Sequence, residues 1–334
     1  MVGGVANYLK DVCRTLGKDN CLVCGPNILA RFFWPKWLPT LFRARKIIRE
    51  KKVDMVLISH ILPMGYLALI YKKIFGIPYI VFTHGMDIVN PRENKWKTFW
   101  MKKIIKNARG VVANSEFTRA EILKLGAKKE KTAVVYPCPN RNIKVLRFKG
   151  GFQGKKVILS VGRLVKRKGV DKVIEAMPKI LESAPEAVYF IVGKGPYKEE
   201  LLELKNKLNL GDSVIFAEDT RDEEMNFFYA SSDIFAMPSR RMGGDVEGFG
   251  IVYLEAALFG KPSVAGNAGG APEAVLNGVT GLVVNPDSAE EIAGAIIKLL
   301  KDDTLRAQMG EAAKNRAMSE FVFEKQMEKI KHLL

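Results

Sequence analysis

Two cations stand where an apolar run gives way to a helical pattern. The run VILSV at 157–161 continues into GRLVKRKG, which puts Arg163 at an expected strand end and Lys168 five residues later. Guanidinium and ammonium groups bind and neutralise a departing diphosphate much as a divalent metal ion does. The positions of Arg163 and Lys168 therefore suit them to neutralise a concentrated negative charge such as a diphosphate. The alternative is solvated surface charge, the commoner state of Arg and Lys.

Two carboxylates follow in the segment PSRRMGGDVEGFGIVYLEAALFGKP at 238–262. Its glycines permit close approach of the backbone to a ligand. A helix expected from Ile251 to about Gly260 also presents free amides at its start, which favours anion binding. Glu255, on the second turn, is placed to accept ribose hydroxyls, and Glu247, in the loop, to reach a sugar ring. The alternative for both is a solvated helix face.

A histidine and an aspartate follow another apolar run, YIVFT at 79–83. His84 lies far in sequence from His60 and His332, so no metal cluster is expected, and a lone histidine is more often structural. Asp87 is a candidate partner for an acceptor hydroxyl.

These residues need strands to position them, and short β-rich runs recur between helical stretches. The runs are MVLIS at 55, YIVFTHG at 79, VVANS at 111, AVVYP at 133, VILSVGR at 157, VYFIVG at 188, VIFA at 214, IFAMPS at 234 and GLVV at 281. Several are continuously apolar, which is typical of parallel strands covered on both faces. The predicted fold class is α/β, with doubly wound parallel sheets that bind ligands beyond the carboxyl ends of their strands.

The length of 334 residues favours two domains. A segment at 140–154 mixes Pro, Gly and charges before a fresh strand begins. We predict a first domain at 1–148 and a second domain at 149–334, with a last helix at about 316–334 crossing back. Two such sheets facing each other would enclose an interdomain cleft.

The basic excess lies in the first half of the chain. The net charge is +17, and residues 1–150 carry 29 Lys and Arg against 9 Asp and Glu. An anionic partner is expected there. Nucleic acid is excluded, because no zinc-finger spacing, RNP-like motif or basic-heptad pattern occurs. An anionic membrane surface or a charged acceptor fits better, and the lack of a leader at Met1 predicts a cytoplasmic protein.

One segment of that half mixes aromatic residues with dense basic residues: RFFWPKWLPTLFRARKIIREKK at 31–52. Aromatic rings suit the headgroup layer of a membrane and cations suit anionic lipids. The segment FWMKKIIKNAR at 99–109 repeats the mixture. A peripheral site on the inner face of the cytoplasmic membrane is one interpretation; a core helix or an acceptor-loop hinge is the other.

Six motifs in order resemble a known enzyme family. They are GGVANYL at 3, THGMD at 83, SVGRLVKRKG at 160, EGFGIVYLE at 247, AGNAGGAPEAV at 265 and NGVTGLVV at 277. Together they are similar to the retaining GT-B glycosyltransferases of family 4, and AGNAGGAPE resembles the phosphatidylinositol mannosyltransferase branch. The resemblance implies two facing Rossmann-like domains, of which the first, at 1–148, is the acceptor side and the second, at 149–334, binds the nucleotide sugar. In that family a β-strand precedes the first glycine turn; here Gly3 nearly begins the chain, so the first strand of the N-terminal domain is expected to be missing.

The resemblance also implies roles for individual residues. Four are expected to be catalytic: His84 beside the reacting sugar, Arg163, Lys168 and Glu247. The expected donor-binding residues are Gly3, Gly4, Arg163, Lys168, Glu247, Gly248, Phe249, Gly250, Glu255 and Glu273, with Gly3 and Gly4 capping the β-phosphate. Retention is explained in the family by front-face attack, in which the leaving phosphate receives the acceptor proton.

The function expected is transfer of a hexose, such as mannose from GDP-mannose, to a lipid-linked or glycan acceptor. The nucleoside-diphosphate sugar is a co-substrate and no metal or other cofactor is required. Two alternatives are a catalytically inactive nucleotide-sugar-binding or membrane scaffold and a GT-B epimerase of UDP-sugars. GKGPYK at 193 is rejected as an NAD site because Lys198 replaces the third glycine. No Asp-x-Asp follows an apolar strand, which argues against a metal-dependent GT-A transferase.

Overall fold

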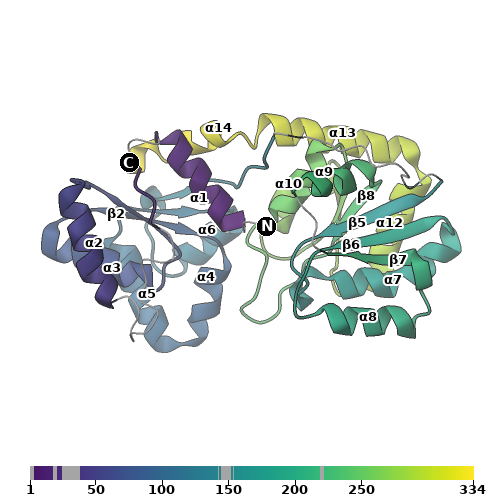
Figure 1. The fold of residues 1–334 in the computed structure, drawn as a ribbon, viewed down its shortest axis with the longest axis horizontal. Coiled ribbons are helices and arrows are strands. Elements are labelled where there is room, and N and C mark those ends of the chain that lie inside the picture. The colour runs from purple at the N-terminus through teal and green to yellow at the C-terminus, as the bar shows by residue number, and fades with distance from the viewer. Residues whose placement is uncertain are drawn as a thin grey trace. The chain divides into compact units, whose positions relative to one another are not determined.

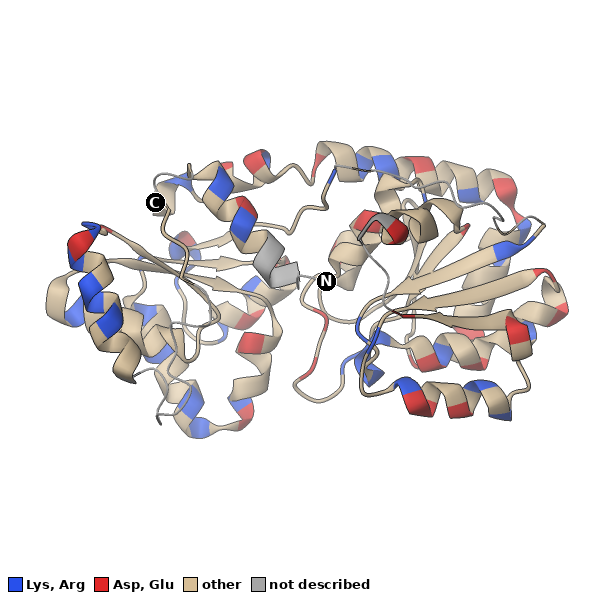
Figure 2. Cartoon of the chain, in the orientation of Figure 1, with Lys and Arg blue, Asp and Glu red and all other residues tan. Residues whose placement is uncertain are grey.

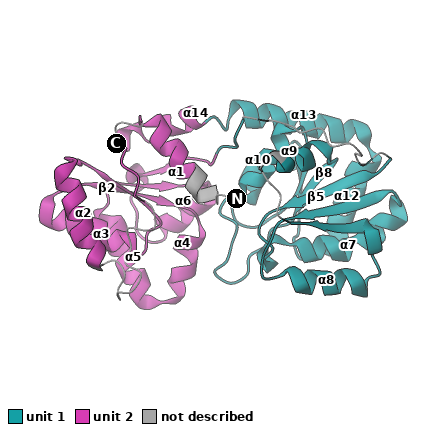
Figure 3. Cartoon of the chain, viewed as in Figure 1, with its two compact units in different colours: residues 1, 138–322 teal, residues 2–137, 323–334 magenta. Residues whose placement is uncertain are grey.

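The computed structural model describes residues 4–17, 21–24, 38–141, 143, 152, 154–218 and 222–334. The chain divides into two compact units (Figure 3). We call residues 2–137 with 323–334 the N-terminal unit, and residues 138–322 the C-terminal unit. The chain therefore passes between the units twice, after Pro137 and again after Val322.

The N-terminal unit contains a parallel sheet whose strands follow chain order. These are β1 (Val56–Ser59), β2 (Tyr79–Thr83), β3 (Gly110–Ala113) and β4 (Thr132–Val134). Ser59 pairs in register with Phe82, and Thr83 with Ala113. Because the strands are parallel, the residues that follow β1, β2 and β3 lie at one edge of this sheet.

The C-terminal unit contains a six-stranded parallel sheet in the order β10-β9-β8-β5-β6-β7. Its strands are β5 (Lys156–Val161), β6 (Ala187–Val192), β7 (Val214–Ala217), β8 (Ile234–Met237), β9 (Ser263–Gly266) and β10 (Gly281–Val284). The strand order reverses between β5 and β8, which pair directly. Open α/β sheets bind ligands at such a switch point, beyond the carboxyl ends of the strands.

Helices alternate with the strands in both units (Figure 1). In the N-terminal unit they are α1 (Gly4–Thr15), α2 (Leu38–Glu50), α3 (Met64–Phe75), α4 (Met86–Val89), α5 (Lys95–Asn107), α6 (Glu116–Leu123) and α14 (Phe323–Glu328). In the C-terminal unit they are α7 (Val170–Ser183), α8 (Lys198–Lys207), α9 (Asp222–Ser231), α10 (Ile251–Leu258), α11 (Ala271–Ala274), α12 (Ala289–Lys301) and α13 (Asp303–Ser319). Short 3-10 turns are η3 (Asn90–Glu93), η4 (Lys129–Lys131), η5 (Lys166–Lys168), η6 (Gly211–Ser213) and η7 (Lys331–Leu333).

Polar residues mark several helix starts. The side chains of Asn94, Ser115, Ser288 and Asp302 each accept a hydrogen bond from the backbone N–H three residues later. Such caps satisfy amides that have no partner within the helix and contribute about 1 kcal/mol each. The local sequence thus fixes where α5, α6, α12 and α13 begin.

Each unit buries its own apolar core around its sheet. All residues of β2 and β6 are buried, as expected of central parallel strands. The apolar face of α7, including Val173, Ile174 and Ile180, belongs to the same cluster as Ile292 and Ile296 of α12. Burial of each large aliphatic side chain contributes about 1.5–3 kcal/mol.

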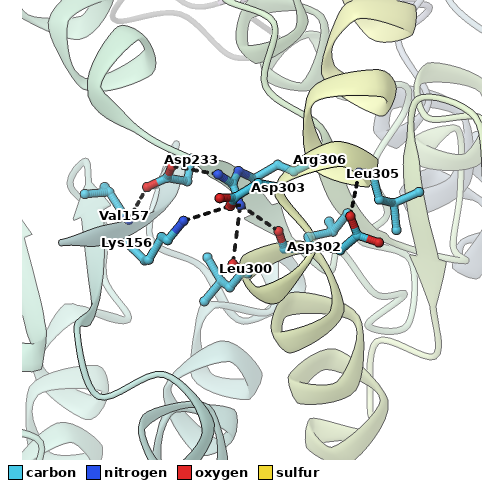
Figure 4. Close-up of polar contacts among 9 residues, drawn as sticks. Lys156, Val157, Asp233, Leu300, Asp302, Asp303, Leu305 and Arg306 are labelled. Atoms are coloured by element: carbon cyan, nitrogen blue, oxygen red, sulfur yellow. Dashed lines mark hydrogen bonds and ion pairs between the residues drawn. The ribbon is translucent and has the colours of Figure 1, made fainter. Parts of the chain in front are cut away.

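A polar network ties the start of β5 to β8 and α13 (Figure 4). Asp233 accepts the Val157 N–H at 2.7 Å, and Lys156 pairs with Asp303 at 2.9 Å. Arg306 pairs with the same Asp303 oxygen at 2.6 Å and donates to the Leu299 carbonyl at 3.0 Å. This network lies at the amino end of β5, so it stabilises the sheet at the end away from Arg163.

The last residues of the chain pack into the N-terminal unit. Gln326 accepts a hydrogen bond from the Tyr136 N–H at 3.2 Å. The Phe323 ring lies edge-on to Tyr8, with 5.7 Å between centroids, and a Cβ at Gly110 would lie 2.9 Å from Leu333. The segment 323–334 is therefore part of the core of this unit.

The predicted α/β class with two parallel sheets is confirmed, and all nine expected runs form strands. The sequence analysis missed β9, because its residues SVAG are small and include only one β-branched side chain. Gly3 lies outside the described residues, and α1 begins at Gly4. In the described ranges, no helix combines the length and apolar character that crossing a membrane requires.

Candidate active site

The loop between β5 and α7 packs directly against the end of β8. Gly169 has a φ of +72°, and a Cβ there would lie 2.1 Å from the Pro238 carbonyl oxygen. Gly193, after β6, approaches the Gly162 carbonyl oxygen as closely, at 2.0 Å from an added Cβ. Only glycine fits such contacts. The loop 162–169 is thereby held at the switch point of the sheet.

A buried ion pair joins the same two loops. Arg240, just after β8, pairs with Asp171 at the start of α7, with 2.6 Å between Nη2 and Oδ2. Both side chains are 8% exposed. The Arg240 backbone N–H also donates to the Arg167 carbonyl at 2.8 Å. Arg240 therefore fixes the position of the turn that carries Arg167 and Lys168.

Two cations converge on one carboxylate oxygen at this point. Lys168 Nζ lies 2.5 Å and Arg167 Nη1 2.6 Å from Glu247 Oε2. All three side chains are nearly buried. Burial opposes ionisation of Glu247, but the charges of Lys168 and Arg167 outweigh it and lower its pKa to about 2. Glu247 is therefore ionised at neutral pH and fixed in orientation.

A second carboxylate lies beside this cluster. Asp245 Oδ1 is 2.8 Å from Arg167 Nε, although the two atoms lack the alignment of a hydrogen bond. Asp245 thus adds negative charge to the cluster without a directed contact.

Arg163 lies at the mouth of the same loop. It lines a pocket with Lys168, Ser160, Val192 and Met237 at the carboxyl end of β5. Its side chain is exposed and makes no ion pair with any residue in the described ranges. The guanidinium is therefore available to an incoming anion.

Glycines bring two further loops together around Glu247. A Cβ at Gly269 would lie 2.2 Å from the Glu247 carbonyl oxygen, and one at Gly270 2.2 Å from that of Gly248. The Gly270 N–H donates to the Glu247 carbonyl at 3.0 Å. Gly250, with a φ of +89°, begins α10. The segment 247–250 is thus fixed from its backbone, beside the start of a helix that favours anions.

Phe249, Glu255 and Glu273 have distinct surroundings. Phe249 is 1% exposed and its ring lies 5.7 Å from that of Phe321, so its side chain belongs to the core. Glu255, on α10, accepts a hydrogen bond from the Tyr229 hydroxyl at 2.8 Å. Glu273 lies in α11 and is half-buried.

Arg163, Lys168, Glu247 and Glu255 were all expected to bind the donor. The structure brings Lys168 and Glu247 into contact and puts Arg163 beside Lys168 in one pocket. The Glu255 carboxylate accepts a hydrogen bond from the Tyr229 hydroxyl. The roles predicted for these residues in donor binding remain predictions.

A separate polar cluster forms in the N-terminal unit, where β1, β2 and β3 end. His84 Nε2 lies 2.9 Å from Ser59 Oγ, and the His84 backbone N–H donates to Asp87 Oδ1 at 2.8 Å. The Asn114 amide donates to the His84 carbonyl at 3.3 Å, and the Tyr8 ring packs edge-on against the imidazole. The three strand ends together hold His84 in place.

Burial governs the ionisation of this cluster. Desolvation, reinforced by the charge of His60, lowers the pKa of His84 to about 3. Burial also disfavours the charged form of Asp87 and so raises its pKa. Hydrogen bonds from the backbone N–H groups of His84 and Ile61 oppose this rise. His84 is therefore neutral at physiological pH and can only give or accept hydrogen bonds there.

Sequence reasoning missed several residues of both clusters. Arg167 stands in the motif KRKG, but only its neighbour Lys168 was predicted to be functional. No local sequence signal identifies Tyr229, Arg240 or Ser59, because their hydrogen-bond partners lie 25 or more positions away. Within the described residues, no three His, Cys, Asp or Glu side chains are grouped to hold a metal ion.

Comparison with known proteins now assigns the family. A family model described as "Glycosyltransferase Family 4" matches residues 2–140, and one described as "Glycosyl transferases group 1" matches residues 142–316. The chain belongs to this glycosyltransferase family. The resemblance drawn from the six motifs is confirmed, and the chain is an enzyme of the glycosyltransferase class.

Two relatives illustrate the match. A GDP-mannose-dependent monoacylated alpha-(1-6)-phosphatidylinositol monomannoside mannosyltransferase of Corynebacterium glutamicum is 30% identical, over 100% of this chain and 94% of the relative. A GDP-mannose-dependent alpha-(1-6)-phosphatidylinositol monomannoside mannosyltransferase of Mycolicibacterium smegmatis is 33% identical, over 83% of this chain and 75% of the relative.

Solved structures support the fold. A glycosyltransferase from Rickettsia africae superposes with a TM-score of 0.78 and 21% identity, over 99% of this chain and 92% of that one. HepE of Anabaena, in complex with UDP, gives 0.76 and 23%, over 88% and 81%. At these identities the similarity establishes the two-domain α/β architecture.

Proposed function

We propose that this glycosyltransferase moves mannose from GDP-mannose to a lipid-linked acceptor, with retention of anomeric configuration and without a metal ion. The observation that carries the proposal is the convergence of Lys168 and Arg167 on Glu247 at the switch point, with Arg163 free beside them. The choice of donor and acceptor follows the printed names of the two mannosyltransferase relatives.

The cations supply what the transfer step requires. As the bond between the sugar and the diphosphate breaks, negative charge accumulates on the leaving group, and fixed positive charges in a dry site stabilise it. Lys168 is 8% exposed, so its charge is poorly screened by water. Arg163 adds a planar fork of donors that matches a phosphate.

The test is a transfer assay with purified protein, a panel of labelled sugar nucleotides and a phosphatidylinositol monomannoside acceptor, with and without EDTA. We expect transfer from GDP-mannose, unaffected by EDTA, and an α-linked product by NMR. Nucleotide binding without transfer to any acceptor would favour an inactive scaffold. Interconversion of UDP-sugars without transfer would favour an epimerase.

We further propose that α2, α3 and α5 form a membrane-facing surface, which we call the aromatic-basic face. Its exposed rings are Phe42 at 69%, Phe75 at 44%, Trp96 at 66% and Phe99 at 53% exposure. Cations lie over them: Arg45 is 5.3 Å from the Phe75 centroid and Lys103 5.5 Å from that of Phe99.

The three helices are neighbours, because α3 contacts both α2 and α5. Lys and Arg recur along α2 and α5 (Figure 2), and neither α3 nor α5 contains an acidic residue. This composition suits an anionic lipid surface, with about 1 kcal/mol for each cation near it. Of the aromatic segment at 31–52, residues 31–37 lie outside the described residues and 38–50 form α2.

Co-sedimentation with vesicles tests this surface. We expect binding to vesicles that contain phosphatidylglycerol, weakening as salt rises from 50 to 500 mM because the attraction is screened. Trp96→Ala and Phe99→Ala should reduce binding, while Met318→Ala, an exposed apolar residue of the C-terminal unit, should not. Equal binding to neutral phosphatidylcholine vesicles would contradict the proposal.

A further inference from the structure

His60 occupies the edge of the N-terminal sheet where β1 ends. It follows Ser59 directly, and its backbone N–H donates to the Phe82 carbonyl of the neighbouring strand at 3.1 Å. Its ring centroid lies 5.0 Å from that of His84. The side chain is therefore part of the polar cluster at the carboxyl ends of the strands, where α/β sheets bind ligands.

The backbone of His60 adopts an uncommon conformation. Its φ is +71°, in the left-handed region that costs a residue with a Cβ about 1–2 kcal/mol. Such conformations persist where the surrounding structure enforces them, and they gather at functional sites. Glycine adopts this conformation without steric cost. The imidazole at position 60 is therefore the unusual feature, and it indicates a functional role for the ring.

Ser59 links the two imidazoles. Its hydroxyl lies 2.9 Å from His84 Nε2 and 3.3 Å from His60 Nδ1. One hydroxyl can donate to one ring and accept from the other, so the tautomers of His60 and His84 are coupled. In either arrangement Nε2 of His60 is left over, and it forms no hydrogen bond with a described residue.

The other polar groups of the cluster are buried or already engaged, although Asp87 Oδ2 is buried without a hydrogen-bond partner among the described residues. His84 has Nε2 turned to Ser59 and is only partly accessible, and Asp87 accepts the His84 N–H. His60 is exposed. It is thus the ring of this cluster that is open to a ligand from solvent.

We propose that His60 binds the acceptor, through a hydrogen bond between its Nε2 and a hydroxyl of a polyhydroxylated acceptor. This proposal rests on the transfer function proposed above and deepens it, because it names a substrate contact that the six motifs do not contain.

The test compares His60→Gly and His60→Asn with the unaltered protein. Glycine removes the imidazole and suits the left-handed backbone, and Asn tolerates that backbone while keeping a shorter polar group. His332→Asn, at an exposed histidine of η7, is the control. For each protein we would measure kcat and KM for acceptor and donor, donor hydrolysis without acceptor, and the melting temperature.

We expect His60→Gly to lower kcat/KM for the acceptor about 10-fold, the loss of roughly one hydrogen bond to substrate. Its donor KM and donor hydrolysis should stay unchanged and its melting temperature should not fall, because glycine suits the left-handed backbone; the acceptor kinetics of His60→Asn should lie between. Full acceptor kinetics in His60→Gly would overturn the proposal, as would an equal fall in donor hydrolysis. If the unaltered protein transfers no sugar to any acceptor, the transfer function itself fails, which is a separate result.

Discussion

Replacement of Glu247 by Gln should destabilise the C-terminal unit through the two cations that it neutralises. Gln has nearly the same shape but carries no charge, so Lys168 would stay almost buried without this counter-charge, and Arg167 would keep only its pair with Asp245 among the described carboxylates. The pKa of Glu247 falls from an ordinary 4.5 to about 2. At 1.36 kcal/mol for each pKa unit, the ionised form contributes about 3 kcal/mol to the free energy of unfolding at pH 7.

The pH dependence gives this prediction its sign. Because the folded-state pKa is depressed, the contribution is complete above pH 4.5 and is lost as the pH falls through about 2. The difference in unfolding free energy between the protein and Glu247→Gln should therefore shrink from about 3 kcal/mol at pH 7 to roughly half of that at pH 3.

Urea unfolding, followed by circular dichroism at pH 7 and at lower pH, measures the difference. Glu311→Gln, at an exposed position on α13, is the matched control and should change little. A difference below about 0.5 kcal/mol at pH 7 would refute the ion-pair argument. So would a difference that stays constant down to pH 3, since a packing defect does not titrate.

Three further changes separate chemistry from structure. Lys168→Ala should lower kcat about 10²-fold in the transfer assay, and it should destabilise less than Glu247→Gln because Arg167 keeps its pair with Glu247. Gly169→Ala should lower the free energy of unfolding by about 2 kcal/mol, because its Cβ would lie 2.1 Å from the Pro238 carbonyl oxygen; urea unfolding would test it. Asp233→Asn should cost about 1 kcal/mol by weakening its bond to the Val157 N–H, with KM for the donor unchanged, since it acts at the far end of β5.

The sequence predicted the strands well because most of them, including β2, β3, β5, β6 and β8, are buried on both faces. Runs such as YIVFT and VILSV have no polar face, and this distinguishes a central parallel strand from a surface helix. β9 escaped prediction because its neighbours β8 and β10 define it more than its own small residues do. Tertiary pairing, and not local propensity, makes SVAG a strand.

The candidate site was predictable only in part. The position of Lys168 after β5 and of Glu247 after β8 followed from the motifs, and adjacency of β5 and β8 brings them together. The participation of Arg167 depends on the 3-10 turn η5, in which consecutive residues point about 120° apart. Only the length of the Arg side chain lets it reach the same oxygen as Lys168, and a linear pattern does not reveal this.

The same long-range pairing explains why His60 was passed over. The distance along the chain between His60 and His84 argued against a metal cluster, and His60 was not considered further. Because β1 and β2 are neighbours in register, these two residues, 24 positions apart, nevertheless meet at one edge of the sheet. The positive φ of His60 has no signature in SHILP, because histidine tolerates that region without demanding it.

The proposed function requires Lys168 and Arg167 to bind an anion, so the presence of the Glu247 carboxylate beside them needs a physical explanation. Without Glu247, the nearly buried Lys168 would lose this counter-charge and Arg167 would keep only its pair with Asp245 among the described carboxylates, at a cost of several kcal/mol in the ligand-free protein. Glu247 keeps both charged and in place, and its Oε2 uses only one donor from each. An ammonium has three N–H donors and a guanidinium five, so most remain for a ligand. On the proposed function, a diphosphate that arrives at Arg163 would meet donors already oriented, and the cost of gathering the charges would have been met in folding.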